Sequence, residues 1–283
     1  MNNEIVPVEL DYRDLVETYG SPLLVLDQAA VRKQYRALVK ALPGVRMHYA
    51  LKPLPHSAVV ATLKAEGCCF DLATNGEVDL MLENQINPDD CIHTHPIKRD
   101  GDIRYALEYG CKVFVFDNPI ELEKFIPYQD KAQLLLRVSF PNPESKVDLS
   151  KKFGCTPEAT LPLLRKAKEL GLNVIGLSFH VGSQVPNSRR HVEAITACNQ
   201  LIRDAAAENI NLQVLDIGGG FPVNYAADGA DLDIYEFCAP IREALSNTPE
   251  GIRLLAEPGR FISAPCMTSV SSVMGKAERF GRM

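Results

Sequence analysis

Short runs of β-branched and other apolar residues alternate with longer amphipathic segments along most of the chain. Such alternation is typical of repeated strand–helix units that build a parallel sheet. The pattern predicts strands at residues 45–51, 68–73, 91–95, 112–117, 133–139, 173–180, 212–218 and 252–258. Between them lie segments with helical periodicity, such as 57–67, 75–85, 157–171 and 191–208. Eight strand–helix repeats predict an α/β fold, a TIM-type (β/α)8 barrel.

Two further strand-like segments lie outside the eight repeats. PLLVLD (22–27) precedes the first helical segment, and residues 266–283 begin with the alternation of a strand. Two isolated strands are marginal on their own. We therefore expect three parts. These are an N-terminal segment whose strand joins a β-domain (1–27), the barrel (28–262) and the start of a truncated β-domain (263–283).

Composition narrows the class of partner. The 283 residues are 46% hydrophobic and 23% charged, with a net charge of -6. An acidic balance argues against a nucleic-acid surface, which needs a basic stripe. No apolar run approaches the roughly 18 to 20 residues that span a bilayer. We therefore expect a small-molecule substrate, with neither nucleic acid nor membrane as a partner.

The cysteines and histidines do not predict a metal site. Eight cysteines are scattered without metal-type spacing, which favours apolar packing in a reducing cytoplasm. His93 and His95 lie two apart on one predicted strand face and could form a metal pair. No carboxylate or cysteine partner is evident for them, so we predict no metal.

Polar residues gather at the predicted carboxyl ends of the strands, where barrel enzymes place their active sites. A lysine at a strand end is most often an ordinary surface lysine. Here Lys52 is accompanied by polar or glycine residues at the ends of four other predicted strands. The residues are Lys52, Asp71, Glu77, His180, Gly218, Gly219, Gly220 and Glu257.

Each of these residues has a specific chemical use. Three consecutive glycines leave backbone N–H groups open to an anion, and the last βα loops of barrels commonly bind phosphate. Arg260 adds a guanidinium for phosphate oxygens, and Ser183 adds a hydroxyl. His180 alone is typical of a core histidine, but beside a phosphate site it could stack on a flat ring. Glu257 ends an apolar strand, where an unpaired carboxylate is costly, so it needs a cationic partner.

Pyridoxal phosphate (PLP) would use all of these groups at once. Its aldehyde suits a buried Lys52, its phosphate suits the glycines and Arg260, and its ring suits His180. A carboxylate such as Glu257 at the pyridine nitrogen keeps the ring protonated and makes it a strong electron sink. The strand-end residues therefore predict PLP as the cofactor.

Six motifs carry a resemblance to a known family: YALKP, FDLATNGE, LSKKFG (149–154), SFHVGS, DIGGGFP and EPGR. The chain resembles the fold-type III PLP-dependent decarboxylases, which act on ornithine, lysine, diaminopimelate or arginine. The resemblance implies that Lys52 is the Schiff-base lysine, that His180 stacks on the cofactor and that Glu257 holds its pyridine nitrogen. It assigns Asp71 and Glu77 to the surroundings of the cofactor. It assigns the phosphate to Ser183, Gly218, Gly219, Gly220 and Arg260, and it places Gly259 among the cofactor-binding residues.

The chain departs from the family in two places. Asp148 stands where some relatives carry an arginine, and the family's C-terminal β-domain has no counterpart. That domain supplies a Cys-Asp pair to the partner's active site in the family homodimer. The resemblance therefore implies PLP binding with weak or no decarboxylation by this chain alone, and a homodimer when the domain is present.

Several functions remain open within the resemblance. Decarboxylation of a basic amino acid, as in polyamine biosynthesis, is favoured. Diaminopimelate-type substrates and carboxylated siderophore or antibiotic intermediates are alternatives. A PLP-dependent racemase typically places arginine at the pyridine nitrogen, and Glu257 argues against it. A non-catalytic PLP-binding homologue also remains, either a stand-alone PLP carrier or a regulator like the antizyme inhibitors.

Overall fold

Eight parallel strands close into a barrel in chain order, and the last pairs with the first. The computed structural model describes residues 11–141, 152–224 and 233–278. The barrel confirms the predicted fold, and each strand lies within the range that the sequence predicts. The strands are β2 (Val45–Ala50), β3 (Cys69–Leu72), β4 (Cys91–His93), β5 (Val113–Phe116), β6 (Gln133–Val138), β7 (Val174–Phe179), β8 (Val214–Asp216) and β9 (Arg253–Ala256).

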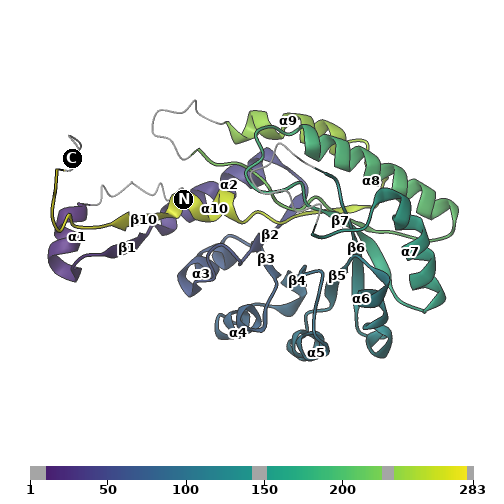
Figure 1. Cartoon of the computed structure of the whole chain (residues 1–283). Helices are drawn as coiled ribbons and strands as arrows, with labels where there is room; N and C mark the ends of the chain where they lie inside the picture. Colours follow the sequence, from purple (N-terminus) through teal and green to yellow (C-terminus); the bar gives the residue numbers. More distant parts are fainter. Residues whose placement is uncertain (1–10, 142–151, 225–232, 279–283) are drawn as a thin grey trace.

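Helices cover the outside of the barrel (Figure 1). Polar caps explain where several of them begin. Asp27 accepts hydrogen bonds from the N–H groups of Ala29 and Ala30, and Thr74 forms a capping box with Glu77. The covering helices are α2 (Gln28–Ala41), α3 (Ser57–Ala65), α4 (Asn75–Glu83), α5 (Asp100–Tyr109), α6 (Pro119–Glu123), α7 (Pro157–Glu169), α8 (Arg189–Ala207) and α9 (Ile234–Leu245). Shorter elements are α1 (Tyr12–Tyr19), α10 (Arg260–Ser263) and the 3-10 turns η1 (Pro88–Asp90), η2 (Ile126–Tyr128) and η3 (Ala264–Cys266).

The hydrophobic core has two parts because successive strand residues face opposite sides of the sheet. The larger part packs the outer strand faces against the helices and includes Tyr49, Phe70 and Phe114. The smaller part fills the barrel itself and consists of Val115, Leu135, Ile175, Val214 and Leu255. This inner aliphatic layer separates the two ends of the barrel from each other.

The two flanking segments form strands, as the sequence predicts. They are β1 (Leu23–Leu26) and β10 (Met267–Val270), which pair antiparallel, with Leu23 opposite Val270. Figure 1 shows this two-stranded sheet together with α1 beside the barrel. Its residues remain largely or partly exposed.

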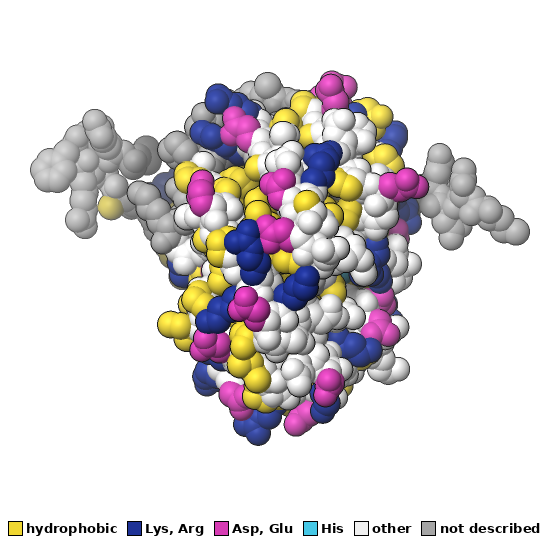
Figure 2. Space-filling view, turned by 90° about the vertical axis from the view of Figure 1, so that its right-hand side faces the viewer, with side chains coloured by type: hydrophobic (Ala, Val, Ile, Leu, Met, Phe, Trp, Pro, Cys, Tyr) yellow, Lys and Arg dark blue, Asp and Glu magenta, His cyan; other side chains and the backbone are white. Residues whose placement is uncertain are grey.

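The surface shown in Figure 2 is mixed in charge, and the cysteines lie inside the protein. Figure 2 shows lysines and arginines interspersed with aspartates and glutamates over the face it presents, with no basic stripe there. Within the described ranges, no helix is long and apolar enough to cross a bilayer. All eight cysteines are buried and unpaired.

Candidate active site

The strand-end residues that the sequence singles out meet at one end of the barrel. Lys52 follows β2, His180 follows β7, the glycines follow β8 and Glu257 follows β9. Asp71 lies in β3, beside Ala50 of the neighbouring strand. Lys52 itself is exposed, which corrects the expectation of a buried lysine. It lies in a turn beyond the last strand residue, where the barrel no longer covers it.

The glycine loop 218–220 packs so closely against its neighbours that larger side chains do not fit. A Cβ at Gly218 would lie 2.1 Å from the carbonyl oxygen of Phe179, and one at Gly220 would lie 2.7 Å from that of Gly182. Both glycines also have positive φ, +65° and +101°. The N–H groups of Gly219 and Gly220 donate to no acceptor within the described residues. The loop therefore offers free backbone donors to an anion.

Ser183 and Arg260 meet beside this loop. The Nε of Arg260 donates a hydrogen bond to the Oγ of Ser183 at 3.1 Å. The loop that carries Ser183 contacts the glycine loop, because the N–H of Val185 donates to the carbonyl oxygen of Gly220 at 3.2 Å. A hydroxyl, a guanidinium and free N–H groups thus lie close together, and this donor set suits a phosphate.

Gly259 connects the EPGR segment to the turn that holds Lys52. A Cβ on Gly259 would lie 3.0 Å from the Cγ of Pro53 and 3.3 Å from the Cβ of Ala50. The N–H of Ala50 also donates to the carbonyl oxygen of Pro258 at 3.2 Å. The lack of a side chain at Gly259 therefore lets the Lys52 turn pack against the segment that carries Arg260.

His180 is a neutral ring beside the glycine loop. Its Nδ1 accepts a hydrogen bond from the N–H of Gly182 at 3.0 Å, so the ring proton belongs on Nε2. Burial lowers the pKa of His180 to about 3, and the charge of Arg137 lowers it further. The Nε2 lies 3.2 Å from the position that a Cβ on Gly219 would take. The imidazole therefore presents a flat, uncharged face at the barrel mouth.

Beneath the mouth lies a layer of three carboxyl groups and a guanidinium. The carboxyls belong to Asp71, Asp216 and Glu257, and the guanidinium belongs to Arg137 of β6. Burial raises the pKa of Glu257 well above its usual range, and the charges of Asp216 and Asp71 raise it further. Burial likewise raises the pKa of Asp71, against a hydrogen bond of 2.6 Å from the hydroxyl of Thr94. One guanidinium cannot balance three carboxylates, so the layer favours an additional proton or cation.

Arg137 is a cationic partner of the kind that the sequence leads us to expect for Glu257. The positive charge of Arg137 also interacts with Asp216 and Asp71, so it is not available to Glu257 alone. The sequence singles out neither Arg137 nor Asp216. A signal for Arg137 exists, since it is the lone charge in the apolar run QLLLRV. Asp216 has a weaker signal as the residue before the glycine motif, where its Oδ1 accepts from the N–H of Gly218 at 2.9 Å.

Glu77 has a structural role in this arrangement. Its Oε2 accepts hydrogen bonds from the N–H groups of Ala73 at 2.6 Å and Thr74 at 3.0 Å, which caps α4. Burial raises its pKa, while those hydrogen bonds and, to a smaller extent, the charge of Lys52 lower it. The carboxylate of Glu77 is thus held by the start of α4 within electrostatic reach of Lys52.

His191 of α8 is a further residue that the sequence does not reveal. Its ring is fully buried, and Nε2 lies 3.0 Å from the carbonyl oxygen of Gly219. The ring stacks on Phe221 with centroids 5.4 Å apart and meets Phe237 edge-on. Burial lowers its pKa to about 4, so the neutral ring donates from Nε2. In the sequence it is an ordinary histidine near the start of an amphipathic helix.

The two histidines that lie two apart in the sequence have different surroundings. His93 ends β4 and packs on Phe114, whereas His95 lies beyond the strand and contacts Phe153. Across the described ranges, no group of three or more histidines, cysteines or acidic residues is placed to hold a metal ion. Asp148 and residues 149–151 of the LSKKFG motif lie outside the described residues.

The model of one protein family matches residues 28–264, which cover the whole barrel. Its description is "Pyridoxal-dependent decarboxylase, pyridoxal binding domain". The chain belongs to the pyridoxal-dependent decarboxylase family. The cofactor of this family is therefore PLP, as the strand-end residues predict.

The curated relatives that match this chain are longer than it is. The lysine/ornithine decarboxylase of Selenomonas ruminantium is 31% identical over 271 residues, which are 96% of this chain and 69% of the relative. The ornithine decarboxylase of Mus pahari is 34% identical over 255 residues, 89% of this chain and 55% of the relative. The chain thus spans between about half and two thirds of these pyridoxal-dependent decarboxylases. Antizyme inhibitor 2 of Xenopus laevis is 33% identical over 257 residues.

Solved structures of pyridoxal-dependent decarboxylases share the fold. The lysine/ornithine decarboxylase of Vibrio vulnificus, complexed with putrescine, is 55% identical with a TM-score of 0.89. It covers 94% of this chain, which corresponds to 71% of that protein. The arginine decarboxylase of Paramecium bursaria Chlorella virus is 27% identical with a TM-score of 0.88, over 95% of this chain and 73% of that protein.

The residues present fit PLP. The free N–H groups of the glycine loop, with Ser183 and Arg260, match the acceptor oxygens of a phosphate. The carboxyl layer that contains Glu257 has more acidic groups than cations, so a protonated pyridine nitrogen would improve its charge balance. The exposed amine of Lys52 lies at the same end of the barrel.

Proposed function

We propose that this chain is the cofactor-binding barrel of a PLP-dependent decarboxylase that converts a basic amino acid into an amine and carbon dioxide. The convergence of Lys52, His180, Glu257 and the glycine loop at one barrel end is the observation that carries the proposal. The family match over the barrel supports it.

The proposed roles follow from the chemistry of each group. Lys52 holds the cofactor covalently through its amine, because it is the lysine at the mouth beside the ring-binding residues. The N–H groups of the glycine loop, the Ser183 hydroxyl and the Arg260 guanidinium hold the phosphate. Gly259 keeps the Lys52 turn against this phosphate site.

The ring of PLP would meet two electrostatically different groups. His180, neutral because of its lowered pKa, would stack on the ring without repelling a cation. The carboxyl group of Glu257 would pair with the ring nitrogen, and a protonated nitrogen would supply positive charge to the acidic layer that Glu257 forms with Asp216 and Asp71. When bound, PLP supplies an electron sink that accepts the pair left on the substrate α-carbon as carbon dioxide departs. Asp71 and Glu77 complete the acidic surroundings of the cofactor.

We propose a lysine- or ornithine-like substrate on the strength of the relatives. Structural neighbours are complexed with putrescine, cadaverine and agmatine, which all carry a cationic group away from the first amine. Diaminopimelate-like substrates and carboxylated siderophore or antibiotic intermediates are the alternatives. Because the relatives extend well beyond the length of this chain, the groups that read the distal end of the substrate belong to the longer form.

The same reasoning sets the expected state of the protein. We propose that the 283-residue chain binds PLP but turns over weakly or not at all, because positioning contributes much of catalysis. A homodimer completes the active site in the longer form. The buried, unpaired cysteines support a cytoplasmic location.

The first experiment is a visible absorbance titration of the purified chain with PLP, beside Lys52→Ala and the surface control Lys33→Ala. We expect a shifted band in the parent and in Lys33→Ala, and no such band in Lys52→Ala. Borohydride reduction followed by peptide mapping should place the cofactor on Lys52. A band that survives in Lys52→Ala, or labelling elsewhere, refutes the proposed site.

Release of carbon dioxide from lysine and ornithine separates the enzyme from a non-catalytic homologue. We expect turnover from a form completed by a C-terminal β-domain, and little from this chain. PLP binding without turnover in the completed form would show a non-catalytic homologue instead. Robust turnover by the 283-residue chain would refute the need for the further domain.

A further inference from the structure

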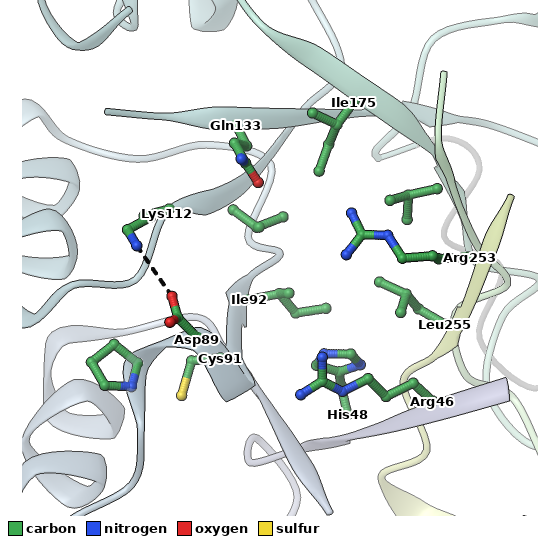
Figure 3. A pocket seen from close by; sticks show the side chains of 13 residues that line it. Arg46, His48, Asp89, Cys91, Ile92, Lys112, Gln133, Ile175, Arg253 and Leu255 are labelled. Atoms are coloured by element: carbon green, nitrogen blue, oxygen red, sulfur yellow. Dashed lines mark hydrogen bonds and ion pairs between the residues drawn. The ribbon is translucent and has the colours of Figure 1, made fainter. Parts of the chain in front are cut away.

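A cavity of about 340 Å³ lies at the end of the barrel opposite the proposed PLP site. Its lining comes from the beginnings of the strands, including Arg46 of β2, Gln133 at the start of β6 and Arg253 at the start of β9. Figure 3 shows the side chains of Arg46 and Arg253 on either side of Ile92, both extending into the pocket. The volume falls within the range of about 300 to 1,000 Å³ that is typical of small-molecule sites.

At the rim of the cavity, two of the three basic side chains form ion pairs with described residues and the third does not. Arg46 forms an ion pair with Asp90 at 2.5 Å, and its Nε donates to the Sγ of Cys69. Lys112 forms an ion pair with Asp89 at 3.2 Å (Figure 3). Arg253 forms no ion pair and no side-chain hydrogen bond with any described residue. The opening of the cavity therefore carries an uncompensated guanidinium.

The cavity is also lined by aliphatic side chains and one imidazole. The aliphatic wall consists of Ile92, Val113, Ile175, Val214 and Leu255. His48 also lines the cavity, is only 3% exposed, and has an Nδ1 without a hydrogen-bond partner among the described residues. Burial lowers its pKa to about 3, with a smaller contribution from Arg46, so the ring is neutral. A buried nitrogen without a partner costs free energy that a ligand can recover.

The distance between these two groups sets the shape of a ligand. Met47 pairs with Ala256, so His48 lies level with Glu257, which is four residues beyond Arg253 on β9. At 3.3 Å per residue that separation is about 13 Å along the strand, shortened by the reach of the arginine side chain. A compact anion at Arg253 cannot also meet His48, whereas an extended one can.

We propose that this cavity binds an elongated aliphatic carboxylate. The carboxylate lies on Arg253, the hydrocarbon chain lies along the aliphatic wall, and a polar group at the inner end meets His48. The amino end of a barrel ordinarily serves stability alone. The exposed guanidinium of Arg253 and the buried Nδ1 of His48 have no partner among the described residues, so both are available to a ligand. The cavity opens at the amino ends of the strands, whereas the residues of the proposed cofactor site follow their carboxyl ends.

The test uses the PLP-loaded chain with labelled isoleucine, leucine and valine methyl groups, titrated with hexanoate and observed by NMR. We expect saturable shifts of the methyl groups of Ile92, Ile175, Val214 and Leu255. Arg253→Gln should weaken hexanoate about tenfold through loss of a charged hydrogen bond. Arg165→Gln, which removes an exposed arginine on α7 paired with Glu208, is the matched control and should bind normally.

The inner end of the site is tested with 6-hydroxyhexanoate. Its hydroxyl should make it bind more tightly than hexanoate to the parent chain, and His48→Leu should abolish that difference. Inorganic phosphate should bind far more weakly than hexanoate. No saturable shift at the wall, equal binding to Arg253→Gln, or binding of phosphate alone would each overturn the proposal. The absorbance band of bound PLP reports separately on the cofactor site.

Discussion

The Nε2 of His191 and the carbonyl oxygen of Gly219 lie 3.0 Å apart, and this contact joins α8 to the glycine loop. The ring of His191 is fixed in turn by stacking on Phe221. A Cβ on Gly219 would lie 3.2 Å from the Nε2 of His180 and 2.6 Å from the carbonyl oxygen of Glu257, so this glycine packs against both. One buried imidazole therefore holds the backbone from which the proposed phosphate donors project.

His191→Phe should weaken PLP binding while leaving the chain folded. The substitution keeps an aromatic ring in the pocket but removes the donor to Gly219, a loss of about 1 kcal/mol, or roughly fivefold in affinity. A PLP titration by absorbance measures the effect. His191→Asn, which can still donate, should recover part of it. Unchanged affinity in His191→Phe, with an unchanged melting temperature of the apo-protein, would contradict this role.

Gly219→Ala should damage the site more severely than an ordinary glycine substitution. Its Cβ would lie 2.6 Å from the carbonyl oxygen of Glu257, so either the loop or the EPGR segment must shift. We expect PLP affinity to fall at least tenfold. Gly76→Ala in α4 is the control, because a Cβ there meets nothing within 4 Å. It should leave PLP affinity unchanged and raise helix stability slightly. Equal PLP affinity in the two variants would show that the loop tolerates the methyl group.

Arg137→Met should destabilise the barrel by about 3 to 5 kcal/mol, because it leaves the carboxyl layer without its guanidinium. Urea unfolding at pH 7 measures the change. Adding Asp216→Asn to Arg137→Met should restore a substantial part of the stability, since fewer carboxylates then share the buried layer. Additive losses in the double variant would show that Arg137 acts by packing rather than by charge.

His93→Leu should raise stability and flatten its dependence on pH. Both ring nitrogens of His93 are buried and have no hydrogen-bond partner among the residues that the structure describes, and burial lowers the pKa of His93 to about 3. The unfolded state, with an ordinary pKa near 6.5, binds more protons between these values, so this histidine costs stability as the pH falls below about 6.5. From pH 6.5 to pH 5 the loss is about 2 kcal/mol.

Urea unfolding at pH 7 and pH 5 tests this effect of His93. The variant should lose about 2 kcal/mol less than the parent over that interval, and it should gain about 1 kcal/mol at pH 7. His56→Asn is the control, because His56 is exposed and an asparagine can replace its cap on α3. An identical pH dependence in parent and His93→Leu would contradict the assignment.

The barrel itself could be predicted from sequence because strand and helix periodicities differ along the chain. The ends of the strands are harder to predict. The sequence pattern predicts one strand over 212–218, yet only Val214–Asp216 is ladder-paired, since Gly218 turns with a positive φ to pack on Phe179. The residues at the barrel mouth could be predicted because parallel strands deliver their ends to one place.

The residues that support the site could not be predicted in the same way. Arg137 and Asp216 lie in strands whose inward face is known only once the register is fixed, and β6 and β7 shift register near Leu134. His191 acts through a contact between a helix and a loop that are 28 positions apart in the sequence. The exposure of Lys52 depends on the turn at Pro53, and the hydrophobic periodicity of the sequence does not predict the shape of that turn.

The pairing of Leu23 with Val270 means that the chain enters and leaves the barrel side by side. The chain therefore enters and leaves the closed barrel at a single place, the β1–β10 pair. A circular permutant that joins residues 20 and 271 and opens the exposed turn at 129–131 would keep every strand ladder. Because its two ends lie on adjacent strands, the barrel can also be inserted into another domain, or separated from one, without breaking the strand pairing that positions the site at its mouth.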